Sequence, residues 1–275
     1  MYEIELKSYK KNWVNLFQKE AQIINKFLNG NIISLIHVGS TSIEDIKAKE
    51  IIDIAVCMDK IISKGHLKLQ FLDLNYIDIA YFEHENYIIL GSKDKKFNLH
   101  IGAYDNNDII NLLLFKLYIS MNQDYKDFYI SLKEEIIERS EPQLYEINKT
   151  NFVNRVIHLA KLAYLSGNIT ENDFDIIFKN SFTYNKEKMI KAITQICIAE
   201  KEESKDDILN YRQLHKNYMD LTKKDLENSP FLLKFEIKNM NDMEIELSQK
   251  HESILKNMMS QTLIRQFMLN RIIKE

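Results

Sequence analysis

The sequence predicts an α+β fold, in which a mixed sheet with flanking helices is followed by an all-α segment. Short runs rich in Ile and Val and bounded by Gly, Ser, Asn or Asp lie in the first 103 residues, and such runs are typical of strands. Apolar residues at helical spacing occur between these runs and dominate after residue 150. With 275 residues, 45% of them hydrophobic, the chain is long enough to bury a full core.

The first half of the chain is expected to contain four helices and four strands. An amphipathic helix over 9–29 comes first, because its apolar residues recur at helical spacing until Asn29, Gly30 and Asn31 interrupt the pattern. The strands are predicted over 32–38, 51–57, 87–90 and 97–103. The remaining helices are predicted over 61–74, 106–121 and 124–139.

The second half is expected to be helical, with apolar stripes that continue into a long final helix over 242–274. The small and polar residues Ser166, Gly167 and Asn168 mark the predicted boundary. We therefore predict two domains, 1–168 and 169–275, which together frame one cleft. The helical domain is also where we expect any contact between copies of the chain.

Composition and charge limit the class of protein. The net charge of −3 provides no overall attraction to nucleic acid or to a membrane surface. Cys57 and Cys197 lack the spacing of metal ligands, which favours reduced thiols. The sequence shows neither a signal-like start nor an apolar run of about 18 residues, so we expect a cytoplasmic protein with no membrane span.

One stretch, HVGSTSIEDIKAKEIIDIAV over 37–56, combines a small, hydroxyl-rich turn with an acidic residue in the next apolar run. Gly39 leaves room for a phosphate group to approach the backbone, and Ser40 supplies a hydroxyl donor. Asp53 on the following strand is then a candidate ligand for Mg²⁺. The alternative is an ordinary strand and turn, in which Asp53 pairs with Lys49.

Several short motifs together resemble the GrpB family, which belongs to the nucleotidyltransferase-fold superfamily. The resemblance covers about residues 5–165. Its segments are SYKKNW (8–13), HVGSTS (37–42), KEIIDI (49–54), NLHI (98–101) and LFK (114–116), together with Tyr145, Lys149 and Phe152. The resemblance implies a nucleotidyltransferase-like sheet over this part of the chain.

The resemblance also implies roles for individual residues. Asp53 and His100 are the implied catalytic residues, and Asp53 is the implied ligand of Mg²⁺. The implied phosphate or ligand contacts are Gly39, Ser40, Thr41, Lys49, Lys116, Tyr145 and Lys149. Tyr145 and Lys149 lie one helical turn apart and can project together.

The chain departs from the family pattern at the metal motif, where the usual Asp-Ile-Asp is Asp53-Ile54-Ala55. The pattern therefore lacks its second carboxylate, which places two-metal chemistry in question. Strand alternation puts positions 53 and 55 on the same face, so no neighbouring side chain automatically replaces the missing group.

These patterns leave several functions open. The first is a nucleotidyltransferase-like enzyme that transfers a nucleotidyl or other phosphoryl-containing group to a small acceptor, with a nucleotide as the ligand. The second is a non-catalytic module that binds a phosphate-bearing ligand or a partner and has lost its metal chemistry. The third is the same pocket adapted to another group transfer or a condensation with His100 as the base.

Overall fold

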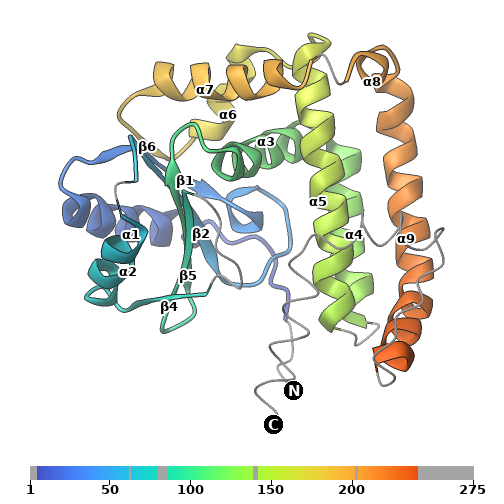
Figure 1. The fold of residues 1–275 in the computed structure, drawn as a ribbon, viewed down its shortest axis with the longest axis horizontal. Coiled ribbons are helices and arrows are strands. Elements are labelled where there is room, and N and C mark those ends of the chain that lie inside the picture. The colour runs from blue at the N-terminus through green and yellow to red at the C-terminus, as the bar shows by residue number, and fades with distance from the viewer. Residues whose placement is uncertain (1–4, 62, 80–85, 139–141, 202–203, 241–275) are drawn as a thin grey trace.

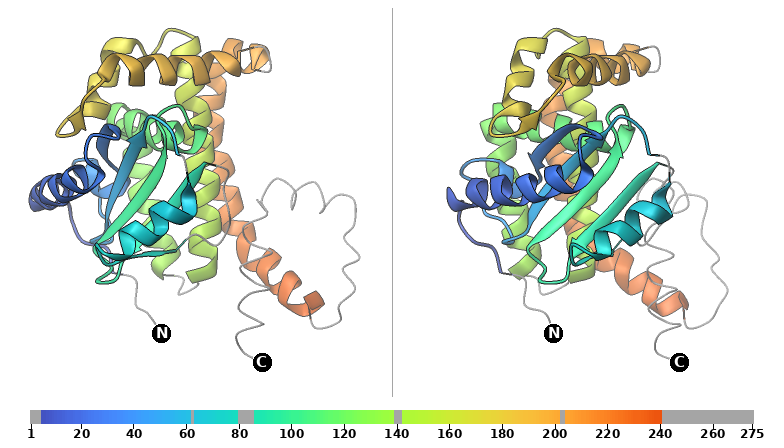
Figure 2. Two further views of the ribbon diagram at one scale, coloured as in Figure 1. Left: turned by 60° about the vertical axis from the view of Figure 1, so that its left-hand side comes forward. Right: turned by 90° about the vertical axis from the view of Figure 1, so that its left-hand side faces the viewer.

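The computed structural model describes residues 5–61, 63–79, 86–138, 142–201 and 204–240. A single twisted sheet lies between two helices on one face and a larger group of helices on the other (Figures 1 and 2). The predicted long helix over 242–274 lies outside the described residues. In the part of the chain that is described, no helix is long and apolar enough to cross a membrane.

Within the described residues, six strands form the sheet in the order β3-β4-β5-β2-β1-β6. Only β2 and β5 pair in parallel among these strands; the other neighbours are antiparallel. The strand bounds are β1 Ile32–Val38, β2 Ile52–Met58, β3 Tyr76–Asp78, β4 Tyr87–Ser92, β5 Phe97–Ala103 and β6 Phe182–Thr183. The mixed sheet with flanking helices is thus as the sequence predicts.

Side-chain alternation along β2 separates the two faces of the sheet. Ile52 and Ile54 pack in a core cluster with helices α1 (Asn12–Leu28) and α2 (Lys64–Leu72). Ala55 and Cys57 point the other way, into a larger cluster with the remaining helices. Because residues two apart in a strand share a face, Asp53 is directed toward this second group of helices.

The second group of helices builds the far wall of the molecule. Helix α3 lies against the sheet, α4 and α5 pack beside it, and α9 runs along α5 on the outside (Figure 1). The Asn106 side chain caps α3 by accepting hydrogen bonds from the backbone of Asp108 and Ile109. The bounds are α3 Asn107–Met121, α4 Gln123–Glu138, α5 Pro142–Leu165, α6 Asp175–Phe178, α7 Lys186–Ala199, α8 Lys205–Leu209 and α9 Tyr211–Met240.

Residues on both sides of position 168 share one core. The two-residue strand β6, inside the segment predicted to be helical throughout, pairs with β1 at the edge of the sheet. A single hydrophobic cluster runs from Ile36 on β1 to Cys197 on α7. Residues before and after the predicted boundary thus pack against one another, and the division into two domains stays a prediction.

Candidate functional site

The turn after β1 approaches the carboxylate of Asp53 closely. Gly39 has a φ of 69°, a backbone conformation that favours glycine. A Cβ atom at this position would lie 2.2 Å from Asp53 Oδ2. Glycine is therefore required at position 39 for two reasons, its backbone angle and the carboxylate beneath it.

Hydroxyl groups fasten this turn, the short 3-10 helix η1 (Ser40–Ser42), to its surroundings. Ser42 Oγ donates to the Gly39 carbonyl at 2.7 Å, and Thr41 Oγ1 donates to the Ile51 carbonyl at 3.3 Å. Thr41 Oγ1 also lies 3.0 Å from Nε2 of His37. Ser40 Oγ pairs instead with the hydroxyl of Tyr129 on α4, at 3.2 Å. Ser40 thus belongs to the side of the turn that faces the helices.

Asp53 sits among groups that stabilise its charged form. Asn98 Nδ2 donates to Asp53 Oδ1 at 3.0 Å, and His100 Nε2 lies 3.5 Å from the same oxygen. Burial acts to raise the pKa of Asp53, but the contacts with His100 and Asn98 and the charge of Lys149 outweigh it and hold the pKa below its ordinary value. The carboxylate is therefore ionised at neutral pH.

The tautomer of His100 follows from its second contact. Tyr87 OH lies 2.6 Å from His100 Nδ1. Burial raises the pKa of Tyr87, so the phenol keeps its proton and donates a hydrogen bond to Nδ1. Nε2 then carries the imidazole proton toward Asp53. In the strand register His100 pairs with Ala55, the position at which the second carboxylate is missing.

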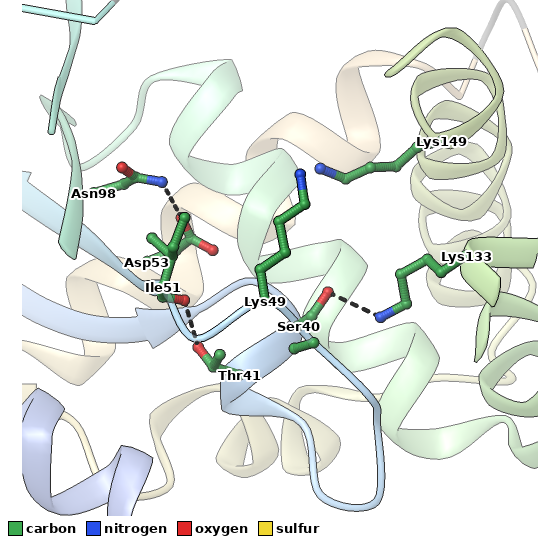
Figure 3. Close-up of a pocket in the computed structure, with 9 residues that line it drawn as sticks. Ser40, Thr41, Lys49, Ile51, Asp53, Asn98, Lys133 and Lys149 are labelled. Carbon is green, nitrogen blue, oxygen red and sulfur yellow. Dashed lines mark hydrogen bonds between the residues drawn. The ribbon is translucent and has the colours of Figure 1, made fainter. Parts of the chain in front are cut away.

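A cavity of about 200 Å³ opens between the strand ends and helices α4 and α5. Figure 3 shows the side-chain amines of Lys49 and Lys149 pointing toward one another across it. The cavity is lined by Ser40, Thr41, Ala48, Lys49, Ile51, Asp53, Asn98, Lys133 and Lys149. The structure thus brings together residues from five elements, namely η1, β2, β5, α4 and α5, and from the loop that precedes β2.

Lys133 on α4 lines this cavity and was not singled out in the sequence. Its side chain is only 1% exposed. Its amine donates to the Lys47 carbonyl, lies 3.5 Å from Ser40 Oγ and sits 4.2 Å from the centre of the Tyr129 ring. Burial, assisted by the charge of Lys149 and opposed by Glu134, lowers the pKa of Lys133 to about 7.

A sequence signal for Lys133 does exist. Tyr129, Leu132 and Ile136 form the apolar stripe of α4, and all three are buried. Lys133 lies four residues after the first and three before the last, so it falls within that stripe. A lysine inside the apolar stripe of a helix is a marker for a buried amine.

Three residues from the sequence analysis lie elsewhere or cannot be placed. Lys116 donates to the carbonyls of His37 and Ile177, both at 2.9 Å, and does not line the cavity. The His37 ring stacks on Phe17 of α1, on the opposite face of the sheet from Asp53. The side chain of Tyr145 lies outside the described part of the chain.

The cavity residues do not fit a magnesium site of the expected kind. Among the described residues that line the cavity, Asp53 is the one carboxylate, beside three lysines. Ala55 is fully buried and offers no ligand atom. In the ranges that the structure describes, no group of three or more His, Cys, Asp or Glu side chains is arranged to hold a metal ion. Because Mg²⁺ prefers several oxygen ligands, this side-chain set favours an anion over a cation.

Comparison with known proteins identifies the family. Residues 3–159 match the family described as GrpB protein, which is more than half of the chain. The chain belongs to the GrpB family. The match includes the turn, Asp53, His100, helix α4 and the part of α5 that carries Lys149, and it ends before α6, β6 and α7.

Individual relatives agree with this assignment. UPF0157 protein BH1888 of Halalkalibacterium halodurans is 27% identical over 163 residues, which cover 57% of this chain and 82% of that protein. Glutamate-rich protein GrpB of Alkalihalophilus pseudofirmus is 26% identical over 165 residues, covering 57% and 95%. The crystal structure of conserved protein GrpB from Enterococcus faecalis superimposes with a TM-score of 0.52 at 26% identity, covering 57% of this chain and 96% of that one.

Proposed function

We propose that the cavity between η1 and helices α4 and α5 binds the phosphate group of a small phosphate-bearing molecule. The observation that carries this proposal is the convergence of Lys49, Lys133 and Lys149 on one cavity that also contains the Ser40 hydroxyl. Amines and hydroxyls are the donors that phosphate oxygens accept most readily. The positive charge of these amines attracts an anion that enters the cavity.

The opposing charge in the cavity is small. Among the described residues that line the cavity, Asp53 is the one carboxylate, and Asn98 and His100 contact one of its oxygens. In this set, three lysines stand beside one carboxylate. Asn98 and His100, on a neighbouring strand of the sheet, stabilise part of the charge of that carboxylate. The balance favours a bound anion.

The size of the cavity indicates which part of a ligand it holds. A volume of about 200 Å³ is below the range of roughly 300–1,000 Å³ that pockets for drug-sized ligands occupy. A phosphate group with a few further atoms fits such a space. The remainder of a larger ligand, such as a nucleoside, then extends out between the sheet and α5.

Transfer of a nucleotidyl or other phosphoryl-containing group is a second candidate, favoured by the arrangement of Asp53, His100 and Tyr87. In this reaction an acceptor hydroxyl oxygen attacks the phosphorus and forms the new P–O bond. The P–O bond to the leaving phosphate breaks, and the acceptor proton passes to Asp53. His100, held by Tyr87, keeps Asp53 oriented and ionised until that step.

A thermal-shift screen over nucleoside mono-, di- and triphosphates, each with and without Mg²⁺, tests the binding proposal. Binding to the native state raises the melting temperature in proportion to the logarithm of ligand excess. We expect a shift with at least one class of phosphate ligand that is lost in Lys149→Met and kept in Lys19→Met, an exposed lysine on α1. The absence of a shift with every nucleotide, with and without Mg²⁺, contradicts the proposal.

A further inference from the structure

We infer that the cavity takes a dianionic phosphate monoester without a divalent cation, and that Lys133 takes up a proton when this ligand binds. The inference rests on the proposed function and adds the ionic form of the ligand and the group that responds to it. It is carried by the position of Lys133: a lysine with almost no exposed surface whose amine reaches the cavity wall beside Ser40.

The surroundings of Lys133 provide no ion-pair partner for its amine. Within the described residues its contacts are the Lys47 carbonyl, the Ser40 hydroxyl and the face of the Tyr129 ring, none of which carries a full negative charge. Among the described residues, the charged and titratable groups that act on it or line the same cavity are Tyr129 and Glu134 on α4, Lys149 on α5, and Lys49 and Asp53.

Two of these groups, Glu134 and Lys149, have opposite effects on the pKa of Lys133. Glu134 forms an ion pair with Lys47 at the surface, so its charge is shared. Lys149, in contrast, places a positive charge toward Lys133 and lowers the pKa of its amine. The cavity without ligand thus penalises the protonated form of Lys133.

A dianion in the cavity reverses this balance. Two negative charges next to the buried amine favour its protonated form, because Coulomb interactions are stronger where water is excluded. The pKa of Lys133 then rises from about 7 toward its ordinary value, and one proton is taken from solvent. A monoanion supplies half of this charge and therefore raises the pKa of Lys133 less.

The bound phosphate needs no divalent cation to neutralise its charge. In phosphoryl-transfer sites of known type, metal ions neutralise the phosphate oxygens. Among the described residues that line the cavity, three lysines stand beside one carboxylate, so a bound cation would meet mainly positive side chains. The lysines therefore supply the neutralising charge themselves.

Calorimetric titration with methyl phosphate and methyl sulfate, both in EDTA, tests the inference with probes of nearly equal shape. Methyl phosphate is a dianion above its second pKa of about 6, whereas methyl sulfate remains a monoanion. We expect methyl phosphate to bind and methyl sulfate to bind at least about tenfold more weakly. Repeating the titration at about pH 8.5 in buffers of different ionisation enthalpy measures the protons taken up, and we expect about one per ligand.

The pH dependence gives a second measurement on the unmodified protein. Between the pKa of the free amine, about 7, and its higher value in the complex, proton uptake makes affinity fall as pH rises. Below about pH 6 the ligand loses its second charge and affinity falls again. We expect the highest affinity for methyl phosphate between these two limits.

Each outcome decides a separate part of the proposal. Binding of methyl phosphate without proton uptake, or equal binding of methyl sulfate, overturns the inference and leaves the phosphate site in place. Binding that requires Mg²⁺ overturns the metal-free part. Failure of every phosphate ligand to bind, with or without Mg²⁺, removes the proposed function and the inference together.

The variant Lys133→Met assigns the proton to this residue. We expect it to weaken methyl phosphate binding about tenfold or more and to abolish proton uptake. Lys161→Met, which removes another buried lysine on α5 that pairs with Glu200, is the matched control and should keep both. Unchanged uptake in Lys133→Met contradicts the assignment, and should that variant not fold, the buffer and pH measurements on the unmodified protein still decide.

Discussion

Two buried lysines lie on the same side of the sheet in very different surroundings. Lys116 is 3% exposed and Lys133 1% exposed, and burial lowers the pKa of each to about 7. Lys116 donates to two backbone carbonyls and joins β1 to α6. Lys133 donates to one carbonyl and lies at a cavity with Ser40 and Lys149.

Burial of an amine therefore does not by itself mark a functional site. Burial disfavours the charged form of both amines. At Lys116 the polar groups around the amine are satisfied within the protein, which gives the residue a structural role. At Lys133 the amines of Lys49 and Lys149 line the same cavity, which is where we propose that a phosphate group binds.

The largest expected effect comes from removing the segment that Lys116 anchors. A chain truncated after Asn168 loses the Ile177 carbonyl, strand β6 and the core residues of α7, including Met189. Each large apolar side chain lost from the core removes about 1.5–3 kcal/mol, and several together exceed a typical total stability of 5–15 kcal/mol. We expect no cooperative unfolding transition by circular dichroism. A soluble fragment with a sharp transition would show that 1–168 is an independent domain.

The next largest effect is expected at Lys116 itself. Lys116→Ala leaves the His37 and Ile177 carbonyls without their donor and opens a cavity, which should lower the free energy of unfolding by about 3 kcal/mol. Lys133→Ala should cost less, because one carbonyl loses its donor and water can enter from the cavity. Urea unfolding measures both, with Lys19→Ala as the surface control. Equal losses at the two lysines would remove the distinction between them.

Replacing Gly39 tests the turn beside the cavity, and Gly167 serves as the control because it has a similar backbone angle. Both have positive φ, 69° and 77°, but a Cβ at Gly167 meets nothing within 4 Å. Replacement by Val should cost each about 1–3 kcal/mol of backbone strain. Only Gly39→Val should also displace the Asp53 carboxylate and abolish the thermal shift with phosphate ligands. Retained ligand binding in Gly39→Val would exclude the turn from the site.

The smallest expected effect is on the pH dependence of stability. The folded-state pKa of each lysine, about 7, lies below that of the unfolded chain, so the unfolded state binds more protons above pH 7 and stability rises with pH. Between pH 7 and 9 each lysine should contribute on the order of 1–2 kcal/mol. Lys116→Met and Lys133→Met should each flatten the rise measured by urea unfolding. A rise that is unchanged in both variants would mean that neither amine is neutral in the folded protein.

Much of the sheet could be predicted because its strands are long enough to show a pattern. The bounds of β1 and β5 agree with the prediction, and β2 differs by one residue. Strands β3 and β6 were missed, since runs of three and two residues carry no periodicity and form only by pairing at the sheet edges.

The site was predictable where neighbours are set by strand geometry. Alternation places Asp53 and Ala55 on one face, and the register places Asn98 and His100 beside them. Lys133 meets Ser40 across 93 residues of chain, a proximity that depends on how α4 packs. Lys116 donates hydrogen bonds to carbonyls of β1 and α6, and the patterns that predict strands and helices do not predict such contacts.

The most direct test is to observe the two buried amines together. Nuclear magnetic resonance of the lysine side chains, recorded near pH 8.5 in EDTA while methyl phosphate is added, reports the charge of Lys133 and Lys116 separately. We expect the chemical shift of Lys133 to change from that of a neutral amine to that of a protonated amine as ligand is added, while the chemical shift of Lys116 does not change. A Lys133 signal that does not change, or two signals that move together, would contradict this expectation.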